Sequence, residues 1–241
     1  TYMNGFNDPR REKYFTESIF TGNDEKGNPI INGFAGLRNG VIVPKGDYRL
    51  YSNMVVKDTD KLLWMNAAEV AFLRSEGALK GWNMGGSAES FYKQGVELSF
   101  EQWGAGSADA YLADSNSTPV IYKDPQGFFS TKTAASKVTI KWNDSDDPEL
   151  KLEKIITQKW IANFPLGHEA WAEFRRTGYP KLMSVVDNRS AGVVSSTRMA
   201  RRLMYPQSEY KENAINVDAA VNSLLIGQDN MATDLWWAKK N

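Results

Sequence analysis

Aromatic residues in polar segments are the residues of this chain best suited to hold a ligand. A sugar ring presents an apolar C–H face that packs on an aromatic ring, while its hydroxyl groups seek Asn, Asp, Gln and Arg. The alternative is that each ring packs beneath its own loop, because burial of a large aromatic side chain is favourable. The candidates lie outside the strongest helical patterns and are Tyr48, Tyr51, Tyr111, Tyr122 and Trp142.

Residues that could act as catalysts are few. The chain has one histidine, His168, and no cysteine, so it lacks the residues for thiol catalysis or Cys-ligated zinc and offers little for a histidine-dependent triad. His168 stands at the start of a predicted helix, where we expect it to pack or to cap. Glu69 and Glu76 share one helix face and resemble the paired carboxylates of a glycosidase. In a helical hairpin, such glutamates more often accept hydrogen bonds from a neighbouring turn.

An acidic cluster at Asn143–Asp147 permits a calcium site, with Asp144 and Asp146 as the candidate ligands. The cluster lacks the glycine and the distant glutamate of an EF-hand loop, and Asp147 suits a helix cap, so a solvated turn is the favoured interpretation. No glycine-rich phosphate loop is found in the sequence. We therefore expect no bound cofactor.

Composition narrows the class of protein. The 241 residues are 41% hydrophobic, which allows a core of ordinary size. Lys and Arg together equal Asp and Glu, 29 of each, so no basic excess favours nucleic acid as a partner. No apolar run approaches the length of a membrane span.

The stretch from Asp147 to Pro180 predicts two helices joined by a tight turn. Asp147 suits the N-cap and Pro148 the first turn of the first helix. Gly178 suits a left-handed cap at the end of the second helix, which Pro180 prevents from continuing. The first helix carries an apolar stripe at helical spacing: Leu152, Ile155, Ile156, Trp160 and Phe164.

A second pair of helices is predicted at 61–103. The first helix is expected over 61–83, Gly85-Gly86 turns the chain, and Ser87 caps the next helix. Small residues along the first helix allow close approach of a neighbour, as in helical hairpins of tetratricopeptide type. Tryptophans on the apolar faces of the predicted helices are expected in the core, and these are Trp64, Trp103, Trp160 and Trp171.

The chain is therefore predicted to be mainly α, with tetratricopeptide-like helical hairpins (an α/α superhelix), long irregular loops and a few short strands. Hairpins of this kind stack because one pair cannot bury its own faces. The predicted divisions are a loop-rich lead-in at 1–60, hairpins at 61–103 and 149–180, an insertion loop at 104–148 and a C-terminal segment at 181–241.

Short strands and a last helix are predicted within the irregular parts. Val41–Val43 is predicted to form a strand beside a hairpin turn at Asn39-Gly40. Val120–Tyr122 and Lys137–Trp142 also have strand-like composition. A last helix is expected at Val217–Ile226.

Four ordered segments resemble the C-terminal part of the SusD/RagB family. KIITQKWIANF is followed by EAWAEFRRTGYP, and the stretch Asn66–Trp103 precedes both. The fourth segment joins RRLMYPQSEYKEN with the terminal DNMATDLWW. Each segment alone is a weak signal, but as an ordered set they are specific and span most of the chain.

The resemblance implies a non-catalytic lipoprotein of the outer membrane in Bacteroidetes. Such a protein captures oligosaccharides on the cell surface during polysaccharide utilisation and passes them to a TonB-dependent, SusC-like transporter. Family members are longer and begin with a lipoprotein signal and a lipid-modified cysteine. The resemblance thus implies that 1–241 is the C-terminal part of a single domain, whose N-terminal half would be both a packing partner and the site of the lipid anchor.

Two other classes of function remain open. Helical hairpin repeats commonly bind a peptide or a protein surface. A glycoside hydrolase is less favoured, because it requires a carboxylate pair across a cleft. Sugar binding without cleavage favours the oligosaccharide-capturing lipoprotein. Peptide binding alone favours the repeat that binds a peptide or a protein, and turnover favours the glycoside hydrolase.

Overall fold

The computed structural model describes residues 1–20, 33–42, 48–225 and 228–238. Over these residues the chain is helical, as predicted, and β-pairing is limited to isolated bridges, Phe15 to Met54 and Tyr122 to Lys132. The helices are α1 (Tyr2–Gly5), α2 (Arg11–Tyr14), α3 (Ala67–Leu79), α4 (Ala88–Trp103), α5 (Asp109–Ala113), α6 (Pro148–Ala162), α7 (Gly167–Thr177), α8 (Gln207–Glu212), α9 (Ala214–Ser223) and the 3-10 turn η3 (Trp236–Ala238).

Helices α3 and α4 form the first predicted hairpin. The Asn66 side chain accepts a hydrogen bond from the Glu69 amide at 2.6 Å, so α3 begins at residue 67 and not at 61 as predicted. Ser87 caps α4, as predicted. A Cβ atom on Gly95 would lie 2.7 Å from the ring of Phe72, so the glycine lets α4 approach α3 closely.

The second hairpin, α6 and α7, follows its sequence signals closely. Asp147 accepts a hydrogen bond from the Leu150 amide at 2.8 Å, and Pro148 occupies the first turn of α6. Gly178 ends α7 with a φ of 79°, the left-handed conformation that a Cβ disfavours. These three capping features are local, which explains why the sequence predicts them.

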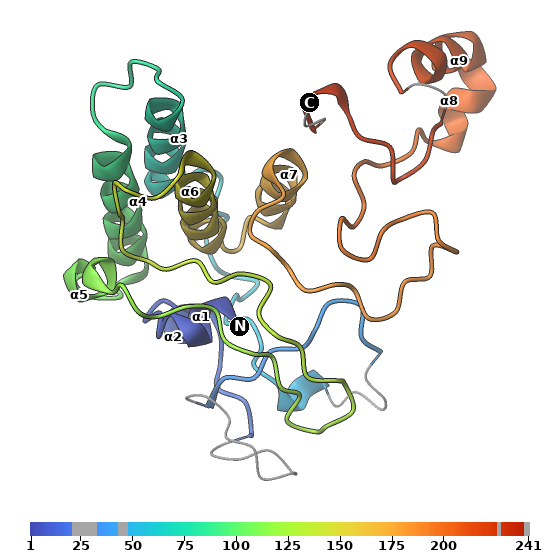
Figure 1. Ribbon diagram of the computed structural model, residues 1–241. Helices are drawn as coiled ribbons and strands as arrows, with labels where there is room; N and C mark the ends of the chain where they lie inside the picture. The colour runs from blue at the N-terminus through green and yellow to red at the C-terminus, as the bar shows by residue number, and fades with distance from the viewer. Residues whose placement is uncertain (21–32, 43–47, 226–227, 239–241) are drawn as a thin grey trace.

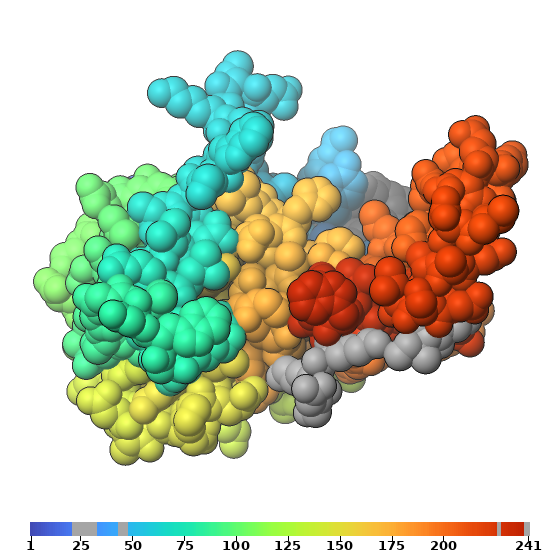
Figure 2. All heavy atoms as spheres, turned by 90° about the horizontal axis from the view of Figure 1, so that it is seen from above, coloured from blue at the N-terminus to red at the C-terminus, as the bar shows by residue number. Residues whose placement is uncertain are grey.

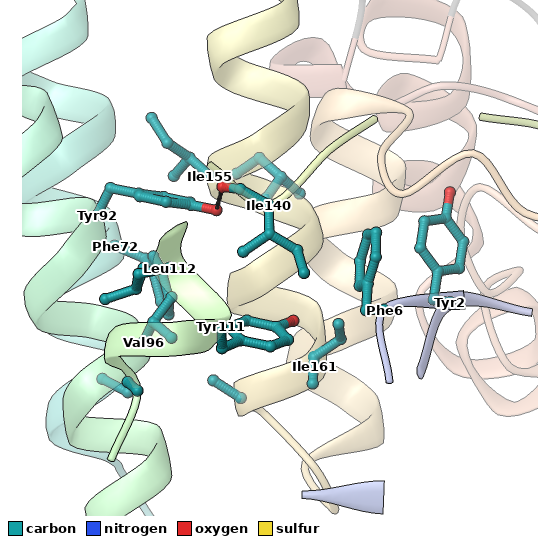
Figure 3. Packing of buried hydrophobic residues seen from close by; sticks show 14 of the residues in the cluster. Tyr2, Phe6, Phe72, Tyr92, Val96, Tyr111, Leu112, Ile140, Ile155 and Ile161 are labelled. Atoms are coloured by element: carbon teal, nitrogen blue, oxygen red, sulfur yellow. Dashed lines mark hydrogen bonds between the residues drawn. The ribbon is translucent and has the colours of Figure 1, made fainter. Parts of the chain in front are cut away.

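Helices α3, α4 and α6 share one core, which the first residues of the chain and the insertion complete; Figure 1 shows the arrangement of these helices. Helix α3 packs on both α4 and α6, and α7 lies beyond α6. Figure 3 shows Ile140, from the insertion between the hairpins, lying between the helices, where its carbonyl accepts a 2.6 Å hydrogen bond from the Tyr92 hydroxyl. Ile140, Ile155 and Phe72 are each fully buried. The insertion therefore helps to close the core and is not a free loop along its whole length.

A buried ion pair anchors the first residues of the chain to both hairpins. The guanidinium of Arg10 contacts the Asp8 carboxylate at 2.6 Å, and both side chains are fully buried. Arg10 also donates to Ser99 on α4 at 2.9 Å and to Gln158 on α6 at 2.9 Å. The ring of Phe100 lies 4.9 Å from this cation. The sequence gives no local sign of this cluster.

Several predicted strands are wrong. Val41 and Ile42 form no strand, and Val43 lies outside the described residues. The turn at Asn39-Gly40 exists, but its carbonyls accept hydrogen bonds from the amides of Val186 and Asp187, each at 3.1 Å, so it pairs with a distant segment instead of closing a hairpin.

The other irregular elements also differ from expectation. Of the segments Val120–Tyr122 and Lys137–Trp142, only Tyr122 takes part in a β-bridge. The predicted last helix at Val217–Ile226 corresponds to α9, which begins three residues earlier than predicted and ends at Ser223. The short helix α8 before it was not predicted, and Ile226 lies outside the described residues.

The C-terminal segment is held together by ion pairs within itself and joins α7 through hydrogen bonds, one of which runs from the Trp171 indole to the Ala200 carbonyl at 2.9 Å. Arg201 contacts Asp234 at 2.6 Å, and Arg202 pairs with Asp229. In Figure 2 the C-terminal residues, in dark red, lie against the orange atoms of the α7 region, while the cyan segment that precedes α3 projects from the body. This projecting segment includes Trp64. We predicted this residue in the core, but its side chain is 82% exposed, so the prediction is wrong.

Candidate functional site

Of the five aromatic candidates, only Tyr48 is open to solvent. Its side chain is 47% exposed, whereas the other four are between 1% and 7% exposed. Tyr111 lies in the helical core, where its ring is 5.4 Å from the Arg10 guanidinium and burial raises the pKa of its hydroxyl. Trp142 packs 5.3 Å from the ring of Tyr92. Neither ring offers a free face for a ligand.

The other three candidates gather in one loop region. In Figure 1 the short turn at 48–50 lies within the loop 120–132. The hydroxyl of Tyr51 donates to the Asp124 carboxylate at 2.5 Å, and the Phe129 amide donates to the same carboxylate at 3.0 Å. Tyr122 fixes the loop through paired backbone hydrogen bonds to Lys132. Tyr51 and Tyr122 thus hold the scaffold that carries Tyr48.

We call the exposed part of this region the Tyr48 surface, made of Tyr48, Arg49, Gln126 and Phe128. Phe128 is 60% exposed and stands four residues from the Asp124 anchor. Arg49 lies with its guanidinium 5.8 Å from the Tyr48 ring. Gln126 accepts a 3.1 Å hydrogen bond from Tyr51 and is partly exposed. An exposed ring with a guanidinium beside it, and an exposed ring and an amide on the loop that anchors it, are the kinds of group that suit a pyranose.

The tryptophans divide between core and surface. Trp103 and Trp160 are half-buried against the core, as predicted. Trp171 is half-buried and covered by the Arg175 guanidinium at 3.7 Å. The indoles that are open to solvent lie elsewhere: Trp64, Trp82 and Trp236 are 82%, 62% and 81% exposed.

Glu76 is held as a structural anion. Arg176 on α7 binds both of its carboxylate oxygens, each at 2.6 Å. Burial alone would raise the pKa of Glu76, but the hydrogen bonds from Arg176 and Lys80 outweigh it and lower the pKa. A general acid needs a raised pKa, so Glu76 does not suit that role.

Glu69 takes part in a second ionic cluster. The ammonium of Lys159, buried on α6, lies 3.2 Å from Glu69, 3.6 Å from Glu169 and 3.5 Å from Glu173. Burial and the charge of Glu69 raise the pKa of Glu169, and Lys159 opposes this. One cation joining three helices is a structural arrangement, and it differs from two carboxylates that face each other across a sugar.

The calcium candidates are engaged with other groups. Asp146 contacts the Lys154 ammonium at 2.6 Å, and Asp144 accepts a hydrogen bond from the Trp142 indole at 2.9 Å. A lysine at the carboxylate opposes a divalent cation, so these residues do not fit a calcium site. Within the described ranges, no group of three or more Asp, Glu, His or Cys is arranged so that it could hold a metal ion. His168 is exposed in the first turn of α7, where Leu166 is the cap residue, so the prediction that it packs or caps is wrong.

Two capped hairpins around one core, with long loops that carry exposed rings, define a tetratricopeptide-like helical scaffold. The sequence model of the SusD-like family, described as SusD and RagB outer membrane lipoproteins, matches residues 1–238. The chain therefore belongs to the SusD-like family. No match was found among curated proteins. In the part of the chain that the structure describes, no helix is long and apolar enough to cross a membrane.

Solved structures support the same assignment. A SusD homologue from Bacteroides uniformis is 52% identical with a TM-score of 0.92, covering 99% of this chain and 48% of its own. A homologue from Bacteroides thetaiotaomicron is 45% identical with a TM-score of 0.88, covering 100% and 51%. A chitin-binding SusD homologue from Flavobacterium johnsoniae is 40% identical with a TM-score of 0.85, covering 100% and 48%. The chain thus spans about half the length of these relatives.

Proposed function

We propose that this chain takes part in the capture of oligosaccharides at the outer-membrane surface and does not cleave them. The observation that carries the proposal is its similarity, over its whole length, to a chitin-binding relative at 40% identity. N-acetylglucosamine oligosaccharides are therefore the first ligands to test. The captured sugar would pass to a TonB-dependent, SusC-like transporter, and a lipid anchor outside these residues would hold the protein at the membrane.

The Tyr48 surface is the proposed contact with the sugar. The rings of Tyr48 and Phe128 supply apolar faces, and Arg49 and Gln126 supply donors and acceptors for hydroxyl groups. Tyr51 and Asp124 position the two loops and are not themselves contacts, because both are buried. A rigid arrangement of this kind reduces the entropy that is lost on binding.

The carboxylates support a non-catalytic role. Glu76 and Glu173 are paired with Arg176 at 2.6 and 2.7 Å, and Glu69 faces Lys159 at 3.2 Å. A glycosidase needs one carboxylic acid that remains protonated until it donates, opposite a second carboxylate. Glu76, Glu173 and Glu69 form ion pairs with these cations, and the ion pairs hold the helices together.

Calorimetric titration with a panel of ligands tests the proposal. The panel contains chitohexaose, other hexasaccharides of different linkage and unstructured peptides, and each mixture is analysed for products after titration. Saturable binding of a sugar without products supports the proposal. Binding of peptides alone, or turnover that persists after repurification, would contradict it.

A further inference from the structure

The two segments that form the Tyr48 surface carry an excess of positive charge. Segments 48–50 and 120–132 contain four charged residues, and three of them are cations, Arg49, Lys123 and Lys132. These three side chains are exposed, whereas the one anion, Asp124, is buried. Because the whole chain has no net charge, the excess belongs to this region and does not follow from composition.

Neighbouring carboxylates do not neutralise these cations. Among the residues that the structure describes, none of the three takes part in an ion pair. The Asp124 carboxylate instead accepts hydrogen bonds from the Tyr51 hydroxyl at 2.5 Å and from the Phe129 amide at 3.0 Å. The charges of the exposed cations therefore remain available to a ligand.

A fourth cation lies beneath the surface. Arg38 is 5% exposed, and its guanidinium is 5.9 Å from the ring of Tyr122. It donates to the Ser184 carbonyl at 2.8 Å, but its Nε has no hydrogen-bond partner, and no carboxylate of the described chain pairs with it. A buried charge is screened less than an exposed one, so Arg38 adds to the positive potential of this region.

The backbone fixes where the exposed cations start. Lys132 is joined to Tyr122 by two backbone hydrogen bonds of 2.8 and 3.1 Å, and Lys123 directly follows Tyr122. The Arg49 guanidinium lies 5.8 Å from the Tyr48 ring. A planar guanidinium can bind a carboxylate or a sulfate through two parallel hydrogen bonds, and an ammonium group attracts either as a point charge.

We propose that the Tyr48 surface selects anionic oligosaccharides, in which N-acetylhexosamine alternates with a uronate or carries a sulfate ester. The exposed rings contact the apolar sugar faces, while Arg49, Lys123 and Lys132 pair with the anionic groups. This inference rests on the proposed capture of sugars at this surface and adds the charge of the ligand. Neutral chitin oligosaccharides then bind the same surface with lower affinity.

Calorimetric titration with matched pairs of sugars tests the inference. The hyaluronan hexasaccharide, in which N-acetylglucosamine alternates with glucuronate, is compared with its methyl ester, which keeps the skeleton and lacks the charge. Sulfated chitohexaose and chitohexaose form the second pair, so that carboxylate and sulfate are tested separately. Hexaglutamate supplies an anion without sugar rings.

Two double variants locate the effect. Lys123→Gln/Lys132→Gln removes two charges from the Tyr48 region, and Lys61→Gln/Lys211→Gln removes two exposed charges elsewhere. We expect wild type to bind at least one anionic sugar about tenfold more tightly than its neutral counterpart at an ionic strength of about 0.01 M. The preference should shrink at about 0.15 M, where the Debye length falls from about 30 Å to about 8 Å. The first double variant should lose most of it, and the second should keep it.

Equal affinity for the charged and neutral sugars of both pairs would overturn the inference and leave sugar capture in place. Failure of all four sugars to bind would overturn the proposed function together with the inference. An equal loss of preference in the two double variants would show that net charge attracts the ligand, and would overturn the selection by this surface. Tighter binding of hexaglutamate than of either anionic sugar would overturn it as well.

Discussion

Replacement of Arg10 by methionine should destabilise the chain strongly. Arg10 is fully buried and binds Asp8, Ser99 and Gln158, so its guanidinium joins the first residues to α4 and α6. Methionine keeps an unbranched, flexible side chain, shorter than that of arginine, but removes the charge and every donor. The carboxylate of Asp8, which is also fully buried, then loses its counter-ion.

The expected cost follows from the uncompensated charge. Removing one partner of a buried ion pair costs about 3–5 kcal/mol. For 241 residues the entropy of unfolding is about 0.5 kcal/mol/K, so a loss of about 4 kcal/mol lowers Tm by about 8 °C. Differential scanning calorimetry of wild type and Arg10→Met measures this shift directly.

A paired replacement separates the buried charge from lost packing. In Asp8→Leu/Arg10→Met both charges are absent, and replacing a buried ion pair with apolar residues is often nearly neutral. We therefore expect the double variant to be more stable than Arg10→Met alone. A single variant that melts within about 2 °C of wild type, or a double variant that melts lower than the single one, would show that the buried charge pair does not hold the first residues to the helices.

Two further predictions concern the helices. Gly95→Ala should lower the free energy of unfolding in urea by about 1–3 kcal/mol, because its Cβ would lie 2.7 Å from Phe72. Gly36→Ala, with open space around its Cβ, should not lower it in this way. Equal costs for the two variants would contradict the close approach of α3 and α4. Because hydrogen bonds from Arg176 lower the pKa of Glu76, Glu76 stabilises the fold above its ordinary pKa, and this contribution is lost as pH falls through the lowered value. Glu76→Gln should therefore reduce stability near neutral pH and flatten its decline in acid, and parallel pH profiles would contradict the assignment.

The hairpins were predictable because their signals are local. Asp147 and Gly178 act on the turn that contains them, and apolar periodicity then fixes which face of α6 is buried. The start of α3 was misplaced by six residues because Leu62 and Trp64 look like part of an apolar stripe. Their exposure, 86% and 82%, depends on what surrounds them in the fold.

The Arg10 cluster and most of the candidate site were beyond sequence reasoning. Arg10 meets Ser99 and Gln158, which lie 89 and 148 residues away along the chain. Tyr111 and Trp142 lie in segments without helical period, yet the insertion runs across the hairpins and buries both rings. Phe128 carried no signal that separated it from a packing residue, because its exposure is set by the Asp124 anchor.

Isothermal titration of chitohexaose into wild type and into Tyr48→Ala decides whether the Tyr48 surface binds sugar, with Ile215→Ala as a control at an exposed apolar residue on α9. Loss of one ring face should weaken binding about five- to tenfold, equivalent to about 1–1.4 kcal/mol. We expect this loss for Tyr48→Ala, unchanged affinity for Ile215→Ala, and intact chitohexaose after each titration. Wild-type affinity in Tyr48→Ala would contradict the Tyr48 surface as the contact, and release of shorter sugars would contradict capture without cleavage.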